Sequence, residues 1–303
     1  ACRISAASHP RARWRGFHNT GTAGVFAAGS AASVLLGHDA DQVENMIGTA
    51  ASYAAGLFTF LAGGDVKRTH PGHAAREGLL AALLTESGLP APRGALEFKD
   101  GYFNAYAGGD TGEVDYSAID LLAAGDNHPK SRFAVANCYM KPYASCRHIH
   151  AMVDAVLDMA ATDGLTAEQV TSVEIASYRV AAAHGGVGWT EMTTAQMSIP
   201  FVVATALHRG RVTLADFGEA ERRDPAIIGL AGRIATDVDA ECEEIYPRKR
   251  GAKVAVTRSD GSVLRRTVME PYGSASKPLT DEAVAEKFLG LAAPRLGQAR
   301  AEE

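Results

Sequence analysis

Three short segments place histidine and cationic side chains directly before predicted helices. They are GFHNTGT at residues 16–22, GGDVKRTHPG at 63–72 and KPYASCRHIH at 141–150. A helix begins with unpaired backbone N–H groups and the positive end of its dipole, so it favours anions. Lysine and arginine add positive charge in two of these segments, and histidine moves protons near neutral pH. The pattern predicts a site for a small anion with several negative groups, such as a di- or tricarboxylate.

A metal site is the first alternative for the same histidines. His70 could pair with His73, or His148 with His150. His70 and His73 stand on either side of Pro71 at a helix start, and no acidic ligand follows at a useful spacing. The four cysteines form no CxxC pair, zinc spacing or iron–sulfur pattern, and there is no nucleotide fingerprint. We therefore expect no metal and no cofactor.

The composition excludes several classes of protein. The 303 residues are 47% hydrophobic, which is enough for one large or two ordinary domains. A net charge of -5 leaves no basic footprint for nucleic acid, and no apolar run is long enough to cross a membrane. The arginine-rich first sixteen residues lack the apolar core of a secretory signal. Cysteines without a disulfide pattern favour a reduced, cytoplasmic protein.

The elements that must position these loops begin with helices. Residues 22–88 predict three of them, the first over 23–36. The second begins at Asp41, whose carboxylate can cap the helix while Glu44 reaches back in a capping box. The third follows the second loop and ends before Gly88. Abundant alanine and glycine favour close packing of these helices.

The pattern changes after about residue 130. A strand is predicted at 170–180, helices at 193–208, 227–239 and 280–289, and a hairpin at 253–269 that turns at Asp260-Gly261. The fold class is therefore mostly α with a smaller α+β lid. We expect residues 1–130 and 275–303 to form the helical domain and residues 131–274 to form the lid.

Several motifs together resemble the MmgE/PrpD family. GFHNTGTAG is similar to its G-[WF]-H-x-T-G-T-x-G pattern, and KRTHPGHAA and KPYASCRHIHAMVDA look like two further segments. YPRKRGAKVAVTRSDGS and KPLTDEAVAEKFLGLA follow in the family's order. The family comprises 2-methylcitrate dehydratases, cis-aconitate decarboxylases and iminodisuccinate epimerases. The resemblance implies a helical domain, a smaller α+β lid and a site between them.

The resemblance also implies roles for individual residues. Its active-site positions fall on His18, Lys67 and Lys141. Neighbours expected to bind the substrate are His70, Arg147, His150 and Arg68. Family members often carry tyrosine at the position of Phe201, and phenylalanine cannot donate a proton.

The implied activity is that of a metal-free lyase on a small polycarboxylate, with dehydration of 2-methylcitrate as the first choice. Decarboxylation of cis-aconitate and epimerisation of iminodisuccinate pass through similar carbanion-like states and stay open. The chain begins almost at the G-x-H motif, whereas the family has a long helical stretch before it. A truncated, non-catalytic fragment or partner subunit is therefore a further alternative. We expect a homodimer, or a missing N-terminal segment, to cover the helix faces left bare.

Overall fold

The computed structural model describes residues 2–108 and 138–303 of the chain. Contacts along the chain divide it into two compact units, Ala1–Phe60 with Gly64–Ala134, and Leu61–Gly63 with Val135–Glu303. In this division residues 275–303 group with the second unit, whereas the sequence analysis assigned them to the helical domain; that assignment stays a prediction. The predicted fold class is confirmed, because helices dominate and the one described sheet is small.

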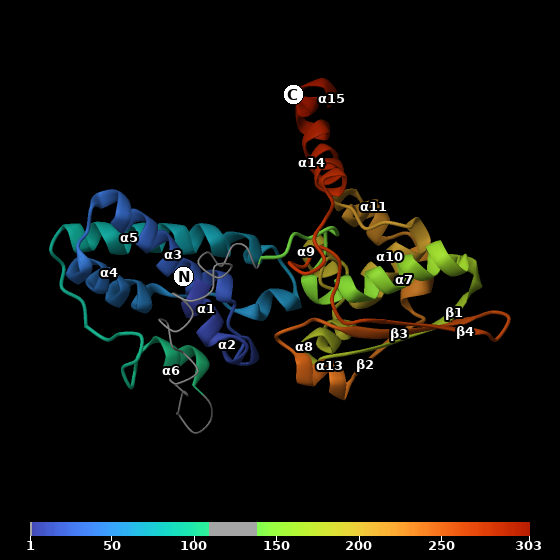
Figure 1. Ribbon diagram of the computed structural model, residues 1–303, viewed down its shortest axis with the longest axis horizontal. Helices are drawn as coiled ribbons and strands as arrows, with labels where there is room; N and C mark the ends of the chain where they lie inside the picture. Colours follow the sequence, from blue (N-terminus) through green and yellow to red (C-terminus); the bar gives the residue numbers. More distant parts are fainter. Residues whose placement is uncertain (1, 109–137) are drawn as a thin grey trace. The chain divides into compact units, whose positions relative to one another are not determined.

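The described part of the first unit is helical (Figure 1). Its helices are α1 (Cys2–Ser8), α2 (Arg11–Trp14), α3 (Asn19–Leu36), α4 (Ala40–Tyr53), α5 (His70–Glu86) and α6 (Tyr102–Ala107). Helices α3, α4 and α5 pack against one another around Phe26, Met46 and Ala81. Gly78 of α5 and Gly29 of α3 let the two helices approach closely. A Cβ at Gly78 would lie 2.4 Å from the carbonyl oxygen of Val25, and one at Gly29 would lie 3.2 Å from the carbonyl oxygen of Gly78. The close packing expected from the composition is present here.

The predicted start of the second helix is wrong by two residues. The helix α4 is capped by Asp39, whose carboxylate accepts a hydrogen bond from the backbone N–H of Gln42 at 2.9 Å. The Gln42 side chain accepts from the backbone N–H of Asp39 at 3.0 Å and completes the capping box. Asp41 and Glu44 fit the same sequence rule, but both pair with Arg93 instead.

The second unit combines helices with one four-stranded sheet. Its helices of six or more residues are α7 (His150–Asp163), α10 (Ile199–Arg209), α12 (Pro225–Ala231), α13 (Ala240–Ile245) and α14 (Asp281–Leu296). The shorter helices are α8 (Arg179–Ala182), α9 (Met192–Ala195), α11 (Glu219–Arg222) and α15 (Gln298–Glu302). The strands are β1 (Val170–Ser177), β2 (Ile234–Val238), β3 (Ala252–Arg258) and β4 (Val263–Val268).

The sheet has the order β2-β1-β3-β4, with β2 parallel to β1 and the other pairs antiparallel. Alternate residues of β1 and β3, including Val173, Ile175 and Val254, are buried in the core of this unit. Helix α7 lies along this sheet and also packs against α10 (Figure 1). The predicted hairpin of β3 and β4 is confirmed, and Gly261 adopts the positive φ of 83° that its turn requires.

The helix predicted at 227–239 is wrong in its second half. Helix α12 ends at Ala231, and residues 234–238 form the strand β2. Pairing with β1 in the sheet outweighs the local helical pattern, because Val173 and Ile175 on β1 align with Ile234 and Thr236. A second predicted helix, 193–208, is split into α9 and α10, where Ser198 caps the latter.

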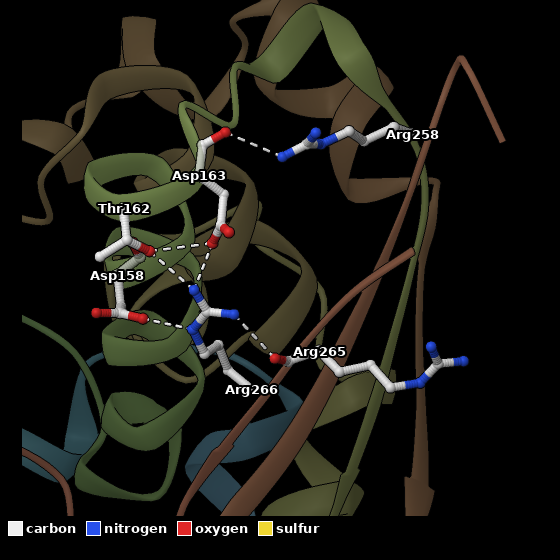
Figure 2. A network of polar contacts seen from close by, with 6 residues as sticks. All are labelled: Asp158, Thr162, Asp163, Arg258, Arg265 and Arg266. Atoms are coloured by element: carbon white, nitrogen blue, oxygen red, sulfur yellow. Dashed lines mark hydrogen bonds and ion pairs between the residues drawn. The ribbon is translucent and has the colours of Figure 1, made fainter. Parts of the chain in front are cut away.

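A polar network joins the end of α7 to the hairpin. Figure 2 shows the Arg266 guanidinium of β4 between the carboxylates of Asp158 and Asp163, with Thr162 beside them. Arg258 of β3 donates to the backbone oxygen of Asp163 at 3.0 Å. These contacts fix α7 relative to the sheet, and α7 begins at the third predicted loop.

Candidate functional site

His18 stands at the start of α3, on a segment held by backbone contacts. Its N–H donates to the carbonyl oxygen of Gly56 at 3.0 Å, and its own carbonyl accepts from the N–H of Gly21 at 2.9 Å. Gly21 allows the close approach, because a Cβ there would lie 2.1 Å from the carbonyl oxygen of Ala55. The backbone therefore fixes the position from which the His18 side chain extends.

The structure brings His18 and His70 together, although 52 residues separate them. His70 is the first residue of α5, and its Nδ1 lies 2.7 Å from Nδ1 of His18. At this distance one nitrogen must donate and the other accept, so one proton lies between the two rings. His70 is 8% exposed and His18 is half-buried. The first two predicted loops therefore meet within the first unit, through these two histidines.

Aromatic rings and cations surround this pair. The His18 ring lies 5.0 Å from the Phe58 ring and 5.3 Å from the Phe60 ring, measured between centroids. The Lys67 ammonium is 5.5 Å from the centroid of Phe60, and the Arg13 guanidinium is 3.7 Å from that of Phe58. Both cations therefore lie near the imidazole, and an aromatic ring replaces water on one side of each.

This environment keeps the histidine pair neutral. Burial is the largest cause that lowers the pKa of His18 to about 4, and His70, Lys67 and Arg13 lower it further through their charge. The pKa of His70 is also lowered, by burial and then by His73. A neutral imidazole pair at physiological pH can accept a proton at one end and release one at the other.

A pocket of about 560 Å³ opens beside His70 on the first unit. Its lining residues are Ala55, Gly56, Thr69, His70, Gly72, His73 and Arg76. Arg76 lies 3.3 Å from Nδ1 of His73 through its Nη2 atom and pairs with Glu77. The pocket thus joins the histidine pair to a cation that could face an anionic ligand.

In the second unit, Lys141 is held at the start of the third loop. Its ammonium donates to the carbonyl oxygen of Ser145 at 3.2 Å, and Lys287 donates to the carbonyl oxygen of Lys141 at 2.6 Å. Burial lowers the pKa of Lys141, and the positive charges of Lys287 and Arg147 lower it further, whereas Cys146 raises it. A desolvated ammonium of this kind gains from a carboxylate ligand more than a solvated one does.

Arg147 and His150 are buried next to each other. Arg147 donates to the carbonyl oxygens of Tyr272 at 2.6 Å and Pro271 at 3.0 Å, to Ser274 Oγ at 2.6 Å, and lies 3.1 Å from Nδ1 of His150. The guanidinium therefore anchors the chain segment after β4. Burial and then the charge of Arg147 lower the pKa of His150 to about 2, so this histidine is neutral.

A second, basic pocket of about 240 Å³ opens next to Arg147. Its lining residues are Tyr139, Arg147, Arg248, Lys249, Arg250, Glu270, Pro271, Ser274, Ala275 and Ser276. Three of its four cations come from one loop before β3, so the sequence concentrates positive charge there.

A third group consists of Cys146, His148 and His184. One ligand atom from each lies within 4.8 Å of the others, and the two imidazole rings are stacked with centroids 5.6 Å apart. Burial would raise the pKa of the Cys146 thiol, but His184, the backbone of His148 and Lys141 together lower it to about 6. The Tyr178 hydroxyl lies 2.5 Å from Nδ1 of His148.

Comparison with known families shows to which family the chain belongs. The MmgE/PrpD N-terminal domain matches residues 1–115, and the MmgE/PrpD C-terminal domain matches residues 143–303. The chain belongs to the MmgE/PrpD family. The resemblance read from the sequence motifs is therefore confirmed.

The chain is similar to curated proteins that are named as cis-aconitate decarboxylases or as similar to them. A cis-aconitate decarboxylase of Aspergillus terreus is 26% identical over an alignment of 303 positions, which covers 95% of this chain and 60% of the relative. A cis-aconitate decarboxylase-like protein of Aspergillus oryzae is 26% identical over an alignment of 288 positions, which covers 92% of this chain and 58% of the relative. The chain thus spans about 60% of the length of the curated relatives it matches.

The MmgE/PrpD residues named from the sequence divide between the two units. The first unit holds His18, Lys67, Arg68 and His70, and the second holds Lys141, Arg147 and His150. His18, Lys67 and His70 lie close together, whereas Arg68 is exposed and faces Asp65 at 3.7 Å. Convergence of all seven on one site stays a prediction. Phe201 is fully buried against Trp189 and Phe217, so this position is part of the core.

Three candidate site residues were missed by the sequence analysis. Arg76 lies six residues after the first residue of α5 and looks like an ordinary helical cation. Cys146 lies inside a recognised motif, but a single cysteine carries no ligand spacing. His184 lies 36 residues after His148 in an unremarkable stretch, so only the fold could place it beside the third loop.

Proposed function

We propose that this chain carries the proton-transfer and anion-binding groups of a lyase that acts on a small polycarboxylate. The observation that carries the proposal is the contact of 2.7 Å between Nδ1 of His18 and Nδ1 of His70. Membership of the MmgE/PrpD family and the cis-aconitate decarboxylase relatives support the same class of reaction.

The pair provides a base and an acid at the same time. The ring that donates through Nδ1 is neutral only if its Nε2 is unprotonated, and that atom can accept a proton. The other ring then carries its proton on Nε2 and can donate it. When the first ring accepts a proton at its Nε2, the shared proton passes to Nδ1 of the second ring, and the second ring releases its Nε2 proton. The roles of the two rings are then exchanged, and neither ring keeps a charge. General acid–base catalysis of this kind contributes roughly 10²–10⁴-fold to a rate.

Cations would stabilise the charge that the reaction creates. Removing a proton beside a carboxylate, or losing carbon dioxide, leaves an electron pair that the remaining carboxylate must accept. Lys67 contributes its charge at the histidine pair, and Arg76 lines the adjoining pocket. Lys141 is the candidate for the same role in the second unit, where burial strengthens its interaction with an anion.

Two reactions fit these groups, and a different observation favours each. Dehydration of 2-methylcitrate breaks a C–H and a C–O bond, and it needs a base for the proton and an acid for the departing hydroxyl. The contact between the two histidines supports the proposal that this pair supplies both. Decarboxylation of cis-aconitate breaks a C–C bond and needs only an acid to protonate the resulting carbanion. The names of the relatives favour this second reaction.

A turnover assay on the purified chain tests the proposal. The substrates are 2-methylcitrate, cis-aconitate and iminodisuccinate, with succinate as an anion that can undergo none of the three reactions. We expect one of the three substrates to be converted, with product identified by NMR. Conversion of none of them, at concentrations where tricarballylate binds, would show that the chain is a binding module and not a lyase.

A variant of the histidine pair separates specific turnover from contamination. His70→Asn keeps a hydrogen-bonding group beside His18 but cannot relay a proton, so turnover should fall about 10²–10⁴-fold. His208→Gln is the matched control, because His208 is exposed on the second unit. Equal activity of both variants would contradict the assignment of the pair.

A further inference from the structure

The group of Cys146, His148 and His184 is not explained by the proton relay proposed above. It lies within the second unit, where His148 precedes α7 and His184 lies in the short turn after α8. One potential ligand atom from each residue lies within 4.8 Å of the other two. Among residues 2–108 and 138–303, these three are the one group of potential metal ligands that lies so close together.

His184 carries the second observation. Its side chain is 1% exposed, and neither Nδ1 nor Nε2 has a hydrogen-bond partner of normal geometry within the described residues, although the Cys146 thiol lies close enough to interact with the ring. A buried polar group without a partner is unfavourable, so an imidazole with two such nitrogens calls for a ligand. The backbone next to it is firmly placed, because a Cβ at Gly185 would lie 2.0 Å from Oγ1 of Thr236 on β2.

We propose that Cys146, His148 and His184 bind a zinc ion. One thiolate and two imidazoles are ligands that Zn²⁺ prefers, whereas Mg²⁺ and Ca²⁺ require oxygen ligands, which this group lacks. Binding converts the Cys146 thiol to a thiolate and releases its proton to solvent. The ion also gives a nitrogen of His184 the partner that it lacks.

The geometry needs only a small adjustment. Tetrahedral zinc holds sulfur and nitrogen ligands about 3.3–3.6 Å apart, given bonds of about 2.3 Å to sulfur and about 2.0–2.1 Å to nitrogen. Rotations that move the ligand atoms by about 1 Å achieve this from the present separations of at most 4.8 Å. The Tyr178 hydroxyl, 2.5 Å from Nδ1 of His148, would orient that ring as a second layer of support.

Three protein ligands leave one tetrahedral position for water or an anion. The site is therefore of the open kind, unlike a structural site with four protein ligands. The sequence analysis expected no metal, because the cysteines formed no metal-binding pattern and no acidic ligand followed the histidines at a useful spacing. It paired His148 only with His150. In the structure, Nδ1 of His150 faces Arg147 instead, and His184 replaces it as the companion of His148.

The test is zinc binding by the whole chain, and it does not depend on which substrate is turned over. Metal-free protein is titrated with zinc chloride, dialysed and measured by elemental analysis. We expect one zinc per wild-type chain, and none retained by Cys146→Ser or His184→Gln. Tyr178→Phe should retain the ion with affinity reduced about 10–100-fold. Cys138→Ser and His208→Gln are matched controls on exposed residues of the same unit and should bind zinc like the wild type.

A cobalt-substituted protein keeps the proposal falsifiable if a ligand variant folds poorly. Wild-type protein loaded with Co²⁺ should show a thiolate-to-cobalt charge-transfer band, which Cys138→Ser retains. The proposal is overturned by wild-type protein that retains no stoichiometric zinc, by copper binding in its place, or by a cobalt complex without thiolate absorption. Unchanged zinc affinity in folded His184→Gln protein overturns it as well.

Discussion

Acidification should destabilise the first unit through His18. The pKa of this imidazole is lowered by burial and by neighbouring positive charge to about 4, whereas an unfolded histidine titrates near 6.5. Above pH 6.5 the ring is neutral in both states and contributes nothing. As the pH falls from 6.5 towards 4, the unfolded state gains a proton that the folded state does not, so the free energy of unfolding decreases.

The magnitude follows from the gap between the two pKa values. It corresponds to at most about 3–4 kcal/mol over the whole window. Because the His18 ring is partly exposed, solvent screening reduces this, and we expect a loss of about 1–2 kcal/mol between pH 7 and pH 4. His70 adds to the loss in the same direction, because its pKa is lowered too.

Two measurements test this reasoning. Urea unfolding followed by circular dichroism at pH 7 and pH 4.5 should show the loss in the wild type and a smaller loss in His18→Asn. The control His208→Gln should behave like the wild type. NMR titration should place the pKa of His18 well below 6. A His18 ring that titrates near 6.5, or an unchanged pH dependence in His18→Asn, would refute the argument from burial and charge.

Three further predictions follow from the same structure. Lys67→Met and Lys141→Met should each fold but lose about 1.5–3 kcal/mol of tricarballylate binding, measured by calorimetry; unchanged affinity would make these lysines structural. Gly21→Ala should destabilise the chain by about 1–3 kcal/mol in thermal unfolding, since its Cβ has no space; an unchanged melting temperature would contradict the packing described. Leu79 and Leu83 of α5 are 49% and 48% exposed, so we expect the chain to self-associate in light scattering and Leu79→Glu to weaken this association. A monomeric wild type would show that this face is solvated and would contradict the prediction.

The sequence predicted elements where local chemistry decides the structure. Gly37 ends α3 with a left-handed φ of 73°, and Gly261 turns the hairpin, because both positions depend on local backbone geometry. The cap of α4 and the strand β2 were predicted wrongly for different reasons. Asp39 and Asp41 are equally good caps by residue type, and β2 forms only because β1 offers it a partner in the sheet.

The candidate site shows the same division. His18, Lys67 and His70 could be named from loop motifs, and their proximity depends on the packing of α3 against α5. His184 had no signal in the sequence, because its relation to Cys146 is purely three-dimensional. Motifs therefore indicated the chemistry of the loops, whereas the partners of each side chain required the fold.

The central claim is that His18 and His70 transfer protons as one unit. It is tested most directly by a double-mutant cycle of turnover with His18→Asn, His70→Asn and the combined variant, on the substrate that the wild type converts. Because one shared proton joins the rings, each single variant should lose about 10²–10⁴-fold in turnover, and the double variant should lose no more than either. Losses that multiply in the double variant, or full turnover in either single variant, would contradict the account.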